Sequence, residues 1–115
     1  MLGHLTLPLR YMSENHGMHR SFDGFEDEVA QVCRALMENG CGIECNVNLG
    51  NTPLPDVKWL RLYHELGGEI ITIGTDAHTP EFVGMRARET QELLKSCGLN
   101  YVGTFEKKKP VLHKI

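Results

Sequence analysis

The sequence has little to offer a nucleic acid or a membrane. Its 115 residues carry a formal net charge of −3 with the histidines neutral, whereas a nucleic-acid-binding domain presents a basic face. The run Lys107–Lys109 is short and typical of a solvated turn. No apolar stretch approaches the roughly 20 residues that cross a bilayer. The N-terminal region has a basic residue only at Arg10 and no long apolar run, so we expect no signal peptide.

The sequence also lacks the cysteine spacings of disulfide frameworks and zinc knuckles. None of its four cysteines (Cys33, Cys41, Cys45 and Cys97) forms a CxxC pair. A free cysteine packs as a small hydrophobic residue, and Cys33 falls on the apolar stripe of a predicted helix. The cysteines therefore indicate buried thiols in a reducing, cytoplasmic setting.

What is present is the pattern of one small folded domain. Hydrophobic residues make up 41% of the chain and charged residues 23%, which is typical of a soluble folded protein. Apolar residues at helical spacing predict three helices. The first covers about 25–38, with Ser21 or Asp23 as N-cap and Asn39-Gly40 at its end; the second covers about 55–66, ending at Gly67-Gly68; the third covers 80–97, with Thr79 as N-cap and Gly98 as its stop.

Strand-like segments alternate with these helices. They cover a stub near 2–5, then 42–47, 69–74 and 101–105, and residues 110–115 form an extended tail. The run 69–74 is nearly continuously apolar, as in a parallel strand that is buried on both faces. Alternating strands and helices indicate βαβ units, so we expect an α/β fold with a parallel sheet and a long loop over 8–24.

Two polar side chains directly follow the buried run. Asp76 and His78 lie just past the expected carboxyl end of that strand, where ligands bind in α/β proteins. A carboxylate and an imidazole two residues apart can face one cavity, and together they suit a divalent metal. On spacing alone the alternative is favoured, namely an aspartate that caps the local turn beside an exposed histidine.

Further candidates lie upstream. His4 ends the N-terminal strand stub. Arg10 follows it at the start of the expected loop, where a guanidinium could hold a phosphate through two parallel hydrogen bonds. The non-functional alternatives are a solvated histidine near the terminus for His4 and a surface ion pair for Arg10. Glu44 and Asn46 share one face of their strand, where we expect Glu44 to be a hydrogen-bonded carboxylate rather than a metal ligand.

The remaining histidines have weaker cases. His16 and His19 lie in the expected loop, where they could reach a site or remain solvated. His64 belongs to the second helix, and His113 lies in the tail.

Several segments match one family in the right order. Residues 65–78 (ELGGEIITIGTDAH) resemble the signature GG-E-I-x-T-x-G-S-D-A-H of the PHP-domain histidinol phosphatases, with Thr75 in place of serine. The other matching segments are 2–5 (LGHL, family L-G-H-L-D), 42–46 (the E-I-N strand), 80–84 (PEFVG, family P-x-x-V-G) and 105–111 (FEKKKPV, family F-x-x-R-K-P). The resemblance covers nearly the whole chain.

This resemblance implies a fold and an activity. The family fold is a distorted (β/α)7 barrel, of which residues 1–115 would be the C-terminal part, a partial barrel of about four parallel strands and three helices. Family members hydrolyse L-histidinol phosphate to L-histidinol and phosphate in histidine biosynthesis, using up to three zinc, manganese or iron ions. The matching motifs imply that His4, Asp76 and His78 bind metal and that Arg10 binds the substrate phosphate.

The sequence departs from the family at several points. The N-terminal half, with its H-x-H pair and further ligands, is absent, and Thr6 replaces the aspartate of the L-G-H-L-D motif. Residues 47–51 lack the arginine that the family places after the E-I-N strand. Three ligands could still hold one metal, with waters in the open positions. The sequence therefore leaves open whether the chain is active alone.

Other readings stay open. A half barrel exposes sheet edges, so we expect a homo-oligomer or pairing with the missing N-terminal half. The chain could instead be a catalytically inactive metal-binding or structural module. An unrelated flavodoxin-like domain is disfavoured, because the sequence has no glycine-rich phosphate loop.

Overall fold

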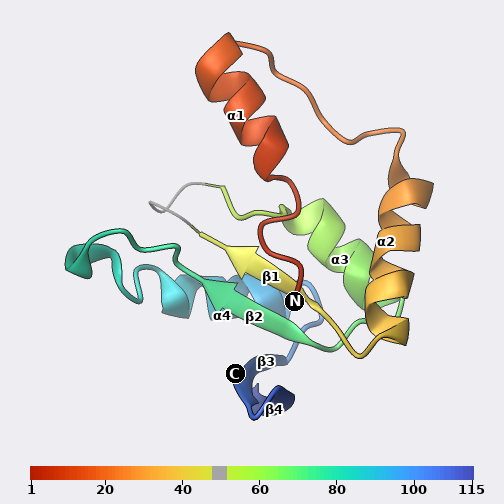
Figure 1. Ribbon diagram of the computed structural model, residues 1–115, viewed down its shortest axis with the longest axis vertical. Helices are drawn as coiled ribbons and strands as arrows, with labels where there is room; N and C mark the ends of the chain where they lie inside the picture. Colours follow the sequence, from red (N-terminus) through yellow and green to blue (C-terminus); the bar gives the residue numbers. More distant parts are fainter. Residues whose placement is uncertain (48–51) are drawn as a thin grey trace.

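A small parallel sheet lies at the centre of the molecule in the structure, a computed structural model that describes residues 1–47 and 52–115 (Figure 1). Strand β1 (Ile43–Asn46) pairs in parallel with β2 (Ile71–Gly74), with Ile43 opposite Ile71. The N-terminal segment adds a parallel bridge between Leu2 and Ile43 on the other side of β1. The expected strand stub is thus confirmed at Leu2, and β1 is flanked by the N-terminal segment and β2.

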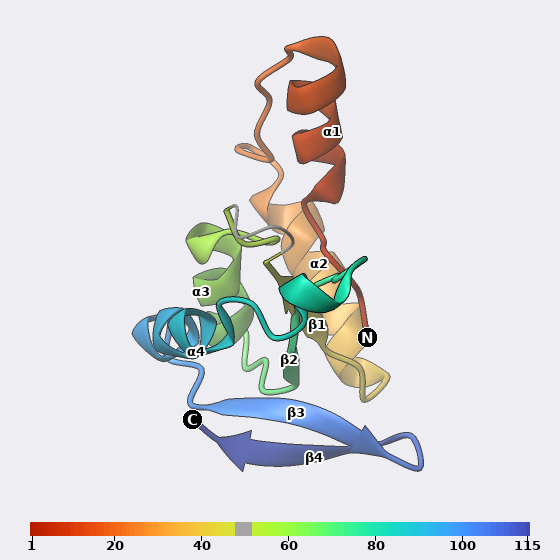
Figure 2. The same ribbon diagram turned by 90° about the vertical axis from the view of Figure 1, so that its left-hand side faces the viewer.

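Three amphipathic helices cover this sheet. Helix α2 (Glu26–Glu38), helix α3 (Val57–Glu65) and helix α4 (Ala87–Ser96) follow the predicted order along the chain. Figure 2 shows α3 and α4 along one side of β1 and β2. The core is formed by apolar side chains from the sheet and from these helices, among them Val29, Cys33, Ile43, Cys45, Trp59, Leu60, Tyr63, Ile71 and Leu94.

The helix ends show how local chemistry sets the boundaries. Asp56 caps α3, because its carboxylate accepts a 3.0 Å hydrogen bond from the backbone N–H of Lys58. Gly98 has a φ of 90° and stops α4, as predicted. The predicted N-cap of α2 was wrong: Phe25 occupies that position, and the hydroxyl of Ser21 donates instead to the carboxylate of Asp23.

The expected loop over 8–24 is partly wrong. Its first half forms helix α1 (Leu7–His16), with a proline in the first turn and Gly17 as a left-handed C-cap at φ 63°. None of the residues of α1 is buried, so the helix has no apolar stripe that periodicity could reveal. Figure 1 shows α1 projecting away from the sheet.

The third predicted helix is shorter than expected. Residues Pro80–Phe82 form one turn of 3-10 helix, and α4 begins only at Ala87. Gly84 and Arg86 lie between them at φ values of 73° and 55°, which a continuous right-handed helix cannot contain. Thr79 takes the predicted N-cap position of the short turn, but its side chain accepts no capping hydrogen bond.

The expected set of four parallel strands is wrong for the described residues. Strand β3 (Tyr101–Glu106) turns back through Lys107 and Lys108 into β4 (Lys109–Lys114), forming an antiparallel hairpin. Both turn lysines have positive φ, 48° and 67°, as a two-residue hairpin of this twist requires. Figure 2 shows the hairpin beyond one end of the parallel sheet.

Strand β2 is less covered than its sequence predicts. Only Ile71 is fully buried, and the rest of the strand is half-buried. A strand that is buried on both faces needs a covering layer on each side. The described residues provide fewer covering elements than a complete barrel would. In residues 1–47 and 52–115, no helix has the length and apolar character needed to cross a membrane.

Candidate metal and phosphate site

The ring of His78 is held by the chain that precedes it. Its Nδ1 lies 2.6 Å from the backbone carbonyl oxygen of Asp76. A carbonyl only accepts hydrogen bonds, so Nδ1 carries the proton. The lone pair of Nε2 is then the metal-binding position of the ring, and an N–H donated to a carbonyl is the usual way in which a ligating histidine is oriented.

Two of the predicted metal ligands lie at unusual backbone positions. His4 has a φ of 31° and Asp76 a φ of 48°, both in the left-handed region that residues other than glycine rarely adopt. The turn at Asp76 directs its carbonyl oxygen towards the ring of His78. Backbone of this kind is concentrated at functional sites, where the surrounding structure maintains it.

Glu44 connects the two flanks of β1. Its Oε2 accepts a hydrogen bond from the backbone N–H of His4 (3.1 Å) and one from Nδ2 of Asn46 (3.3 Å). Its carboxylate also lies over Gly74 of β2, where a Cβ atom would overlap Oε1. Glycine is therefore required at position 74 for this placement. The prediction that Glu44 is a hydrogen-bonded carboxylate is confirmed.

The predicted ligands are not gathered around one point in the described residues. No group of three or more histidine, cysteine, aspartate or glutamate side chains within 1–47 and 52–115 could hold a metal ion. Asp76 and His78 follow β2, whereas His4 lies on the opposite flank of β1. With strands about 4.8 Å apart, the two flanking backbones are separated by about 10 Å. The assignment of the three residues as metal ligands stays a prediction.

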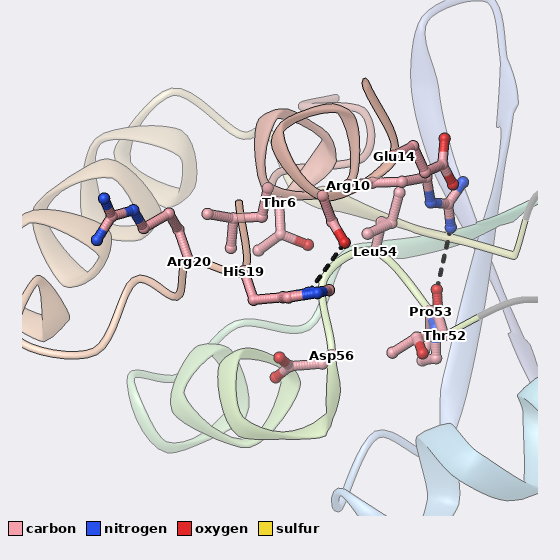
Figure 3. Close-up of a pocket in the computed structure, with 11 residues that line it drawn as sticks. Thr6, Arg10, Glu14, His19, Arg20, Thr52, Pro53, Leu54 and Asp56 are labelled. Carbon is pink, nitrogen blue, oxygen red and sulfur yellow. Dashed lines mark hydrogen bonds between the residues drawn. The ribbon is translucent and has the colours of Figure 1, made fainter. Parts of the chain in front are cut away.

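Arg10 lies on α1 at the edge of an open cavity of about 450 Å³ (Figure 3). Its Nη2 donates a 3.2 Å hydrogen bond to the backbone carbonyl of Thr52. The cavity reaches the carboxyl end of β1, because its wall residue Leu54 pairs with Asn46. The residues that line this cavity include none of the three predicted metal ligands, and the role of Arg10 in phosphate binding stays a prediction.

Several residues that line the cavity were not predicted from the sequence. Ser13 and Glu14 share the cavity face of α1 with Arg10, and the Ser13 hydroxyl lies 3.1 Å from Nδ1 of His19. Their spacing of three and four residues from Arg10 would have placed them together had the helix been recognised. Asp56 lines the opposite wall and was missed because its capping position resembles an ordinary helix start.

The other histidines lie elsewhere. His16 ends α1, and the ring of His64 occupies the space where a Cβ at Gly98 would lie. Nε2 of His113 is 2.8 Å from the hydroxyl of Thr104 across the hairpin. The stretch noted for its missing arginine falls largely on residues 48–51, which lie outside the described residues.

The four cysteine thiols are unpaired, and most of them are buried in the core. Cys33, Cys45 and Cys97 are buried and free, and Cys41 is half-buried and free, in agreement with the predicted unpaired thiols. Burial raises the pKa of Cys45 to about 12, with smaller contributions from the charges of Cys97 and Glu44. Such a thiol stays protonated near neutral pH and is a poor nucleophile or metal ligand.

Comparison with curated proteins gives a consistent set of relatives, although no protein-family model matches the chain. A probable histidinol-phosphatase of Thermotoga maritima is 29% identical over 110 residues, covering 93% of this chain and 45% of that protein. A probable histidinol-phosphatase of Clostridium acetobutylicum is 26% identical over 113 residues, covering 93% of this chain and 42% of that protein. A histidinol-phosphatase of Lactococcus lactis is 28% identical over 78 residues, covering 65% of this chain and 29% of that protein.

The extent of these matches is informative. The chain spans less than half the length of each of these relatives. Two of the matches nevertheless cover almost all of the chain itself. The resemblance inferred from the motifs is confirmed: over nearly its whole length, this chain is similar to part of the histidinol-phosphatases.

Proposed function

We propose that the chain is part of a metal-dependent phosphomonoesterase that hydrolyses L-histidinol phosphate to L-histidinol and phosphate in histidine biosynthesis. The observation that carries this proposal is the orientation of His78 by the carbonyl of Asp76 at the end of β2. It gives the chain a histidine whose Nε2 is prepared for a metal, next to a carboxylate. The similarity to proteins named histidinol-phosphatases supplies the substrate.

The donor atoms of the three predicted ligands suit a divalent metal, although the described residues do not bring the three to one point. His4, Asp76 and His78 offer two imidazoles and one carboxylate, which suit zinc, manganese or iron. A bound metal would act as a Lewis acid and lower the pKa of a coordinated water. Two contacts within the chain position the predicted ligands. Glu44 accepts a hydrogen bond from the backbone N–H of His4, and the carbonyl of Asp76 orients the ring of His78. In the family pattern up to three ions are held, with further ligands from additional polypeptide.

Substrate binding is assigned to Arg10. Its guanidinium has five N–H donors, of which one is bonded to the carbonyl of Thr52. A planar guanidinium can give two parallel hydrogen bonds to one phosphate, which also neutralises charge. Arg10 lines a cavity that reaches the carboxyl end of β1 through Leu54, and we place the substrate phosphate in this cavity.

We also propose that residues 1–115 form the C-terminal half of a larger barrel. The relatives are more than twice as long as the matched region. An apolar cavity of about 550 Å³ lies along the N-terminal segment at the open side of the sheet, and Leu5 continues it into a second one of about 270 Å³ on α2. Phe25 and Tyr11, at these cavities, are more than half exposed. An apolar face beside an open sheet edge favours cover by an N-terminal half or by a second copy of the chain.

A catalytically inactive half-barrel that self-associates is the alternative. The observation that favours it is that the described residues contain no assembled group of three metal ligands. This module would bind metal weakly or not at all. It would not hydrolyse phosphate esters under any assembly.

Metal analysis together with a phosphatase assay separates the two functions. We expect the chain, supplied with the N-terminal half of a relative and with manganese or zinc, to release phosphate from L-histidinol phosphate. Asp76→Ala should abolish both metal retention and turnover, whereas Asp27→Ala, an exposed aspartate on α2, should change neither. Metal-independent activity that survives Asp76→Ala would contradict the proposal. A complete assembly that binds metal and stays inactive would favour the alternative.

A further inference from the structure

The cavity beside Arg10 has walls of opposite charge. Its ionisable lining residues, with the histidine neutral, are two arginines (Arg10 and Arg20) and two carboxylates (Glu14 and Asp56). These charges sum to zero. A site built only for an anion such as inorganic phosphate would show a surplus of positive charge. A cavity with no net charge suits a ligand that itself carries one positive and one negative group.

Arg10 and Asp56 reach the cavity from different elements. Arg10 lies on α1 beside Thr52, whereas Asp56 lies at the start of α3. Figure 3 shows Arg10 and Thr52 at one side of the cavity, and His19 and Asp56 at the other. A small molecule that spans the cavity would thus meet Arg10 and Glu14 at one end, and Asp56 and His19 at the other.

Asp56 is held in place independently of any ligand. As the N-cap of α3, it accepts the backbone N–H of Lys58 through Oδ1 at 3.0 Å. The backbone before it is fixed by Leu54, which is buried and exchanges hydrogen bonds of 2.8 and 3.0 Å with Asn46. A carboxylate fixed in this way needs little reordering to bind a cation.

We propose that Asp56 is a specificity-determining residue that binds the protonated amine of an amino-alcohol phosphate ester, whose phosphate is bound by Arg10. The inference rests on the proposed function and deepens it, since L-histidinol phosphate carries a primary amine on the carbon next to the one that bears the phosphate ester. His19, held by Ser13, lines the same end of the cavity as Asp56. The ammonium forms a charge-assisted hydrogen bond with the carboxylate, which a phosphate ester lacking the amine cannot form.

The test measures binding without turnover. The 115-residue chain, kept metal-free with a chelator, is titrated calorimetrically with L-histidinol phosphate, with L-histidinol and with inorganic phosphate. Asp56→Asn removes the charge and keeps the cap, because asparagine caps helices about as well as aspartate. We expect this variant to bind the two amine-containing probes about tenfold to a hundredfold more weakly and to bind inorganic phosphate unchanged.

Two control variants define the comparison. Arg10→Gln should weaken binding of the two phosphate-containing probes and leave L-histidinol unaffected. Asp27→Asn, which makes the same charge change on α2 outside the cavity, should alter none of the three affinities. A melting temperature of Asp56→Asn equal to that of the wild type would show that the fold is retained.

Different results would contradict the amine-binding role of Asp56 and the proposed function. Equal weakening of all three probes by Asp56→Asn, or no weakening of any, would overturn the inference. Absence of binding of every probe to the wild type would overturn it as well. If the affinities change as expected but no metal-loaded assembly hydrolyses the ester, the proposed function fails and the amine-binding role of Asp56 stands.

Discussion

The Nδ1 nitrogen of His78 lies 2.6 Å from the backbone carbonyl oxygen of Asp76. This contact depends on the positive φ of Asp76, which turns the chain directly after β2. It sets the tautomer of the ring and leaves Nε2 as the nitrogen with a lone pair. In the proposed metal site this pair would be one half, to which other ligands must be added.

Loss of the His78 ring should lower metal affinity. We expect His78→Ala to weaken binding of zinc or manganese by at least about tenfold, because a ligand and its oriented lone pair are removed. Calorimetric titration of the chain measures this directly. His113→Ala is the matched control, since that histidine contacts Thr104 on the distant hairpin. Equal affinities for both variants would remove His78 from the metal site.

A side chain at position 74 should displace Glu44. In Gly74→Ala the new Cβ overlaps Oε1 of Glu44, so we expect a loss of about 1–3 kcal/mol in the free energy of unfolding. Urea denaturation measures the change. Gly103→Ala is the control, because its Cβ would meet Ile71 only at an ordinary contact distance of 3.5 Å.

A double-mutant cycle tests the assigned cause. With Glu44→Ala in the background, Gly74→Ala should cost less, because the overlapping carboxylate is gone. Fully additive costs would show that Glu44 does not occupy the space over Gly74.

The ion pairs of Lys58 should shape stability at low pH. Its ammonium bonds the carboxylates of Asp23 and Glu26, and hydrogen bonding to Lys58 lowers the pKa of each from 3.8 and 4.5. A carboxylate with a lowered folded pKa contributes stability above its unfolded value and loses it as the pH falls through the folded value. We therefore expect the melting temperature of the wild type to fall as the pH drops below about 4.5.

Lys58→Met should flatten this acid limb, because the carboxylates lose the partner that lowered their pKa. Melting curves between about pH 7 and pH 3 give the comparison. The effect should be small, since all three groups are exposed and such pairs contribute little. Lys108→Met in the hairpin turn is the control. An identical acid limb in wild type and Lys58→Met would contradict the assigned cause.

The turn of the β3–β4 hairpin should accept glycine with a gain in stability. Lys108 has a φ of 67°, and lysine is strained there whereas glycine is not. We expect Lys108→Gly to raise the free energy of unfolding by about 0.5–1 kcal/mol. Lys109→Gly, placed in β4, should lower it. Destabilisation by Lys108→Gly would show that the chain does not turn back at this point.

The sequence by itself determined the elements that carry an apolar stripe and a local stop signal. Helices α2 and α3 and the end of α4 were predicted, because buried residues recur at helical spacing and a glycine follows each helix closely. Strands β1 and β2 were predicted from compact apolar segments. The proximity of Asp76 to His78 is equally local, since two residues of sequence separation bring them together.

Elements without such a stripe were not predicted. Helix α1 buries none of its residues, so its composition looked like that of a loop. The antiparallel return of β4 depends on two lysines in left-handed conformations, where the usual signal is asparagine followed by glycine. Both depend on backbone geometry that side-chain polarity does not encode.

Only the tertiary structure decided how distant residues meet. The sequence placed Glu44 on one face of a strand, but its hydrogen bond to His4 and its position over Gly74 depend on the pairing of three separate segments. The cavity that joins Arg10 and Asp56 depends on where α1 lies relative to the start of α3. Local periodicity fixes which residues share an element, whereas the contacts between elements come from burial of apolar surface that is distributed over the whole chain.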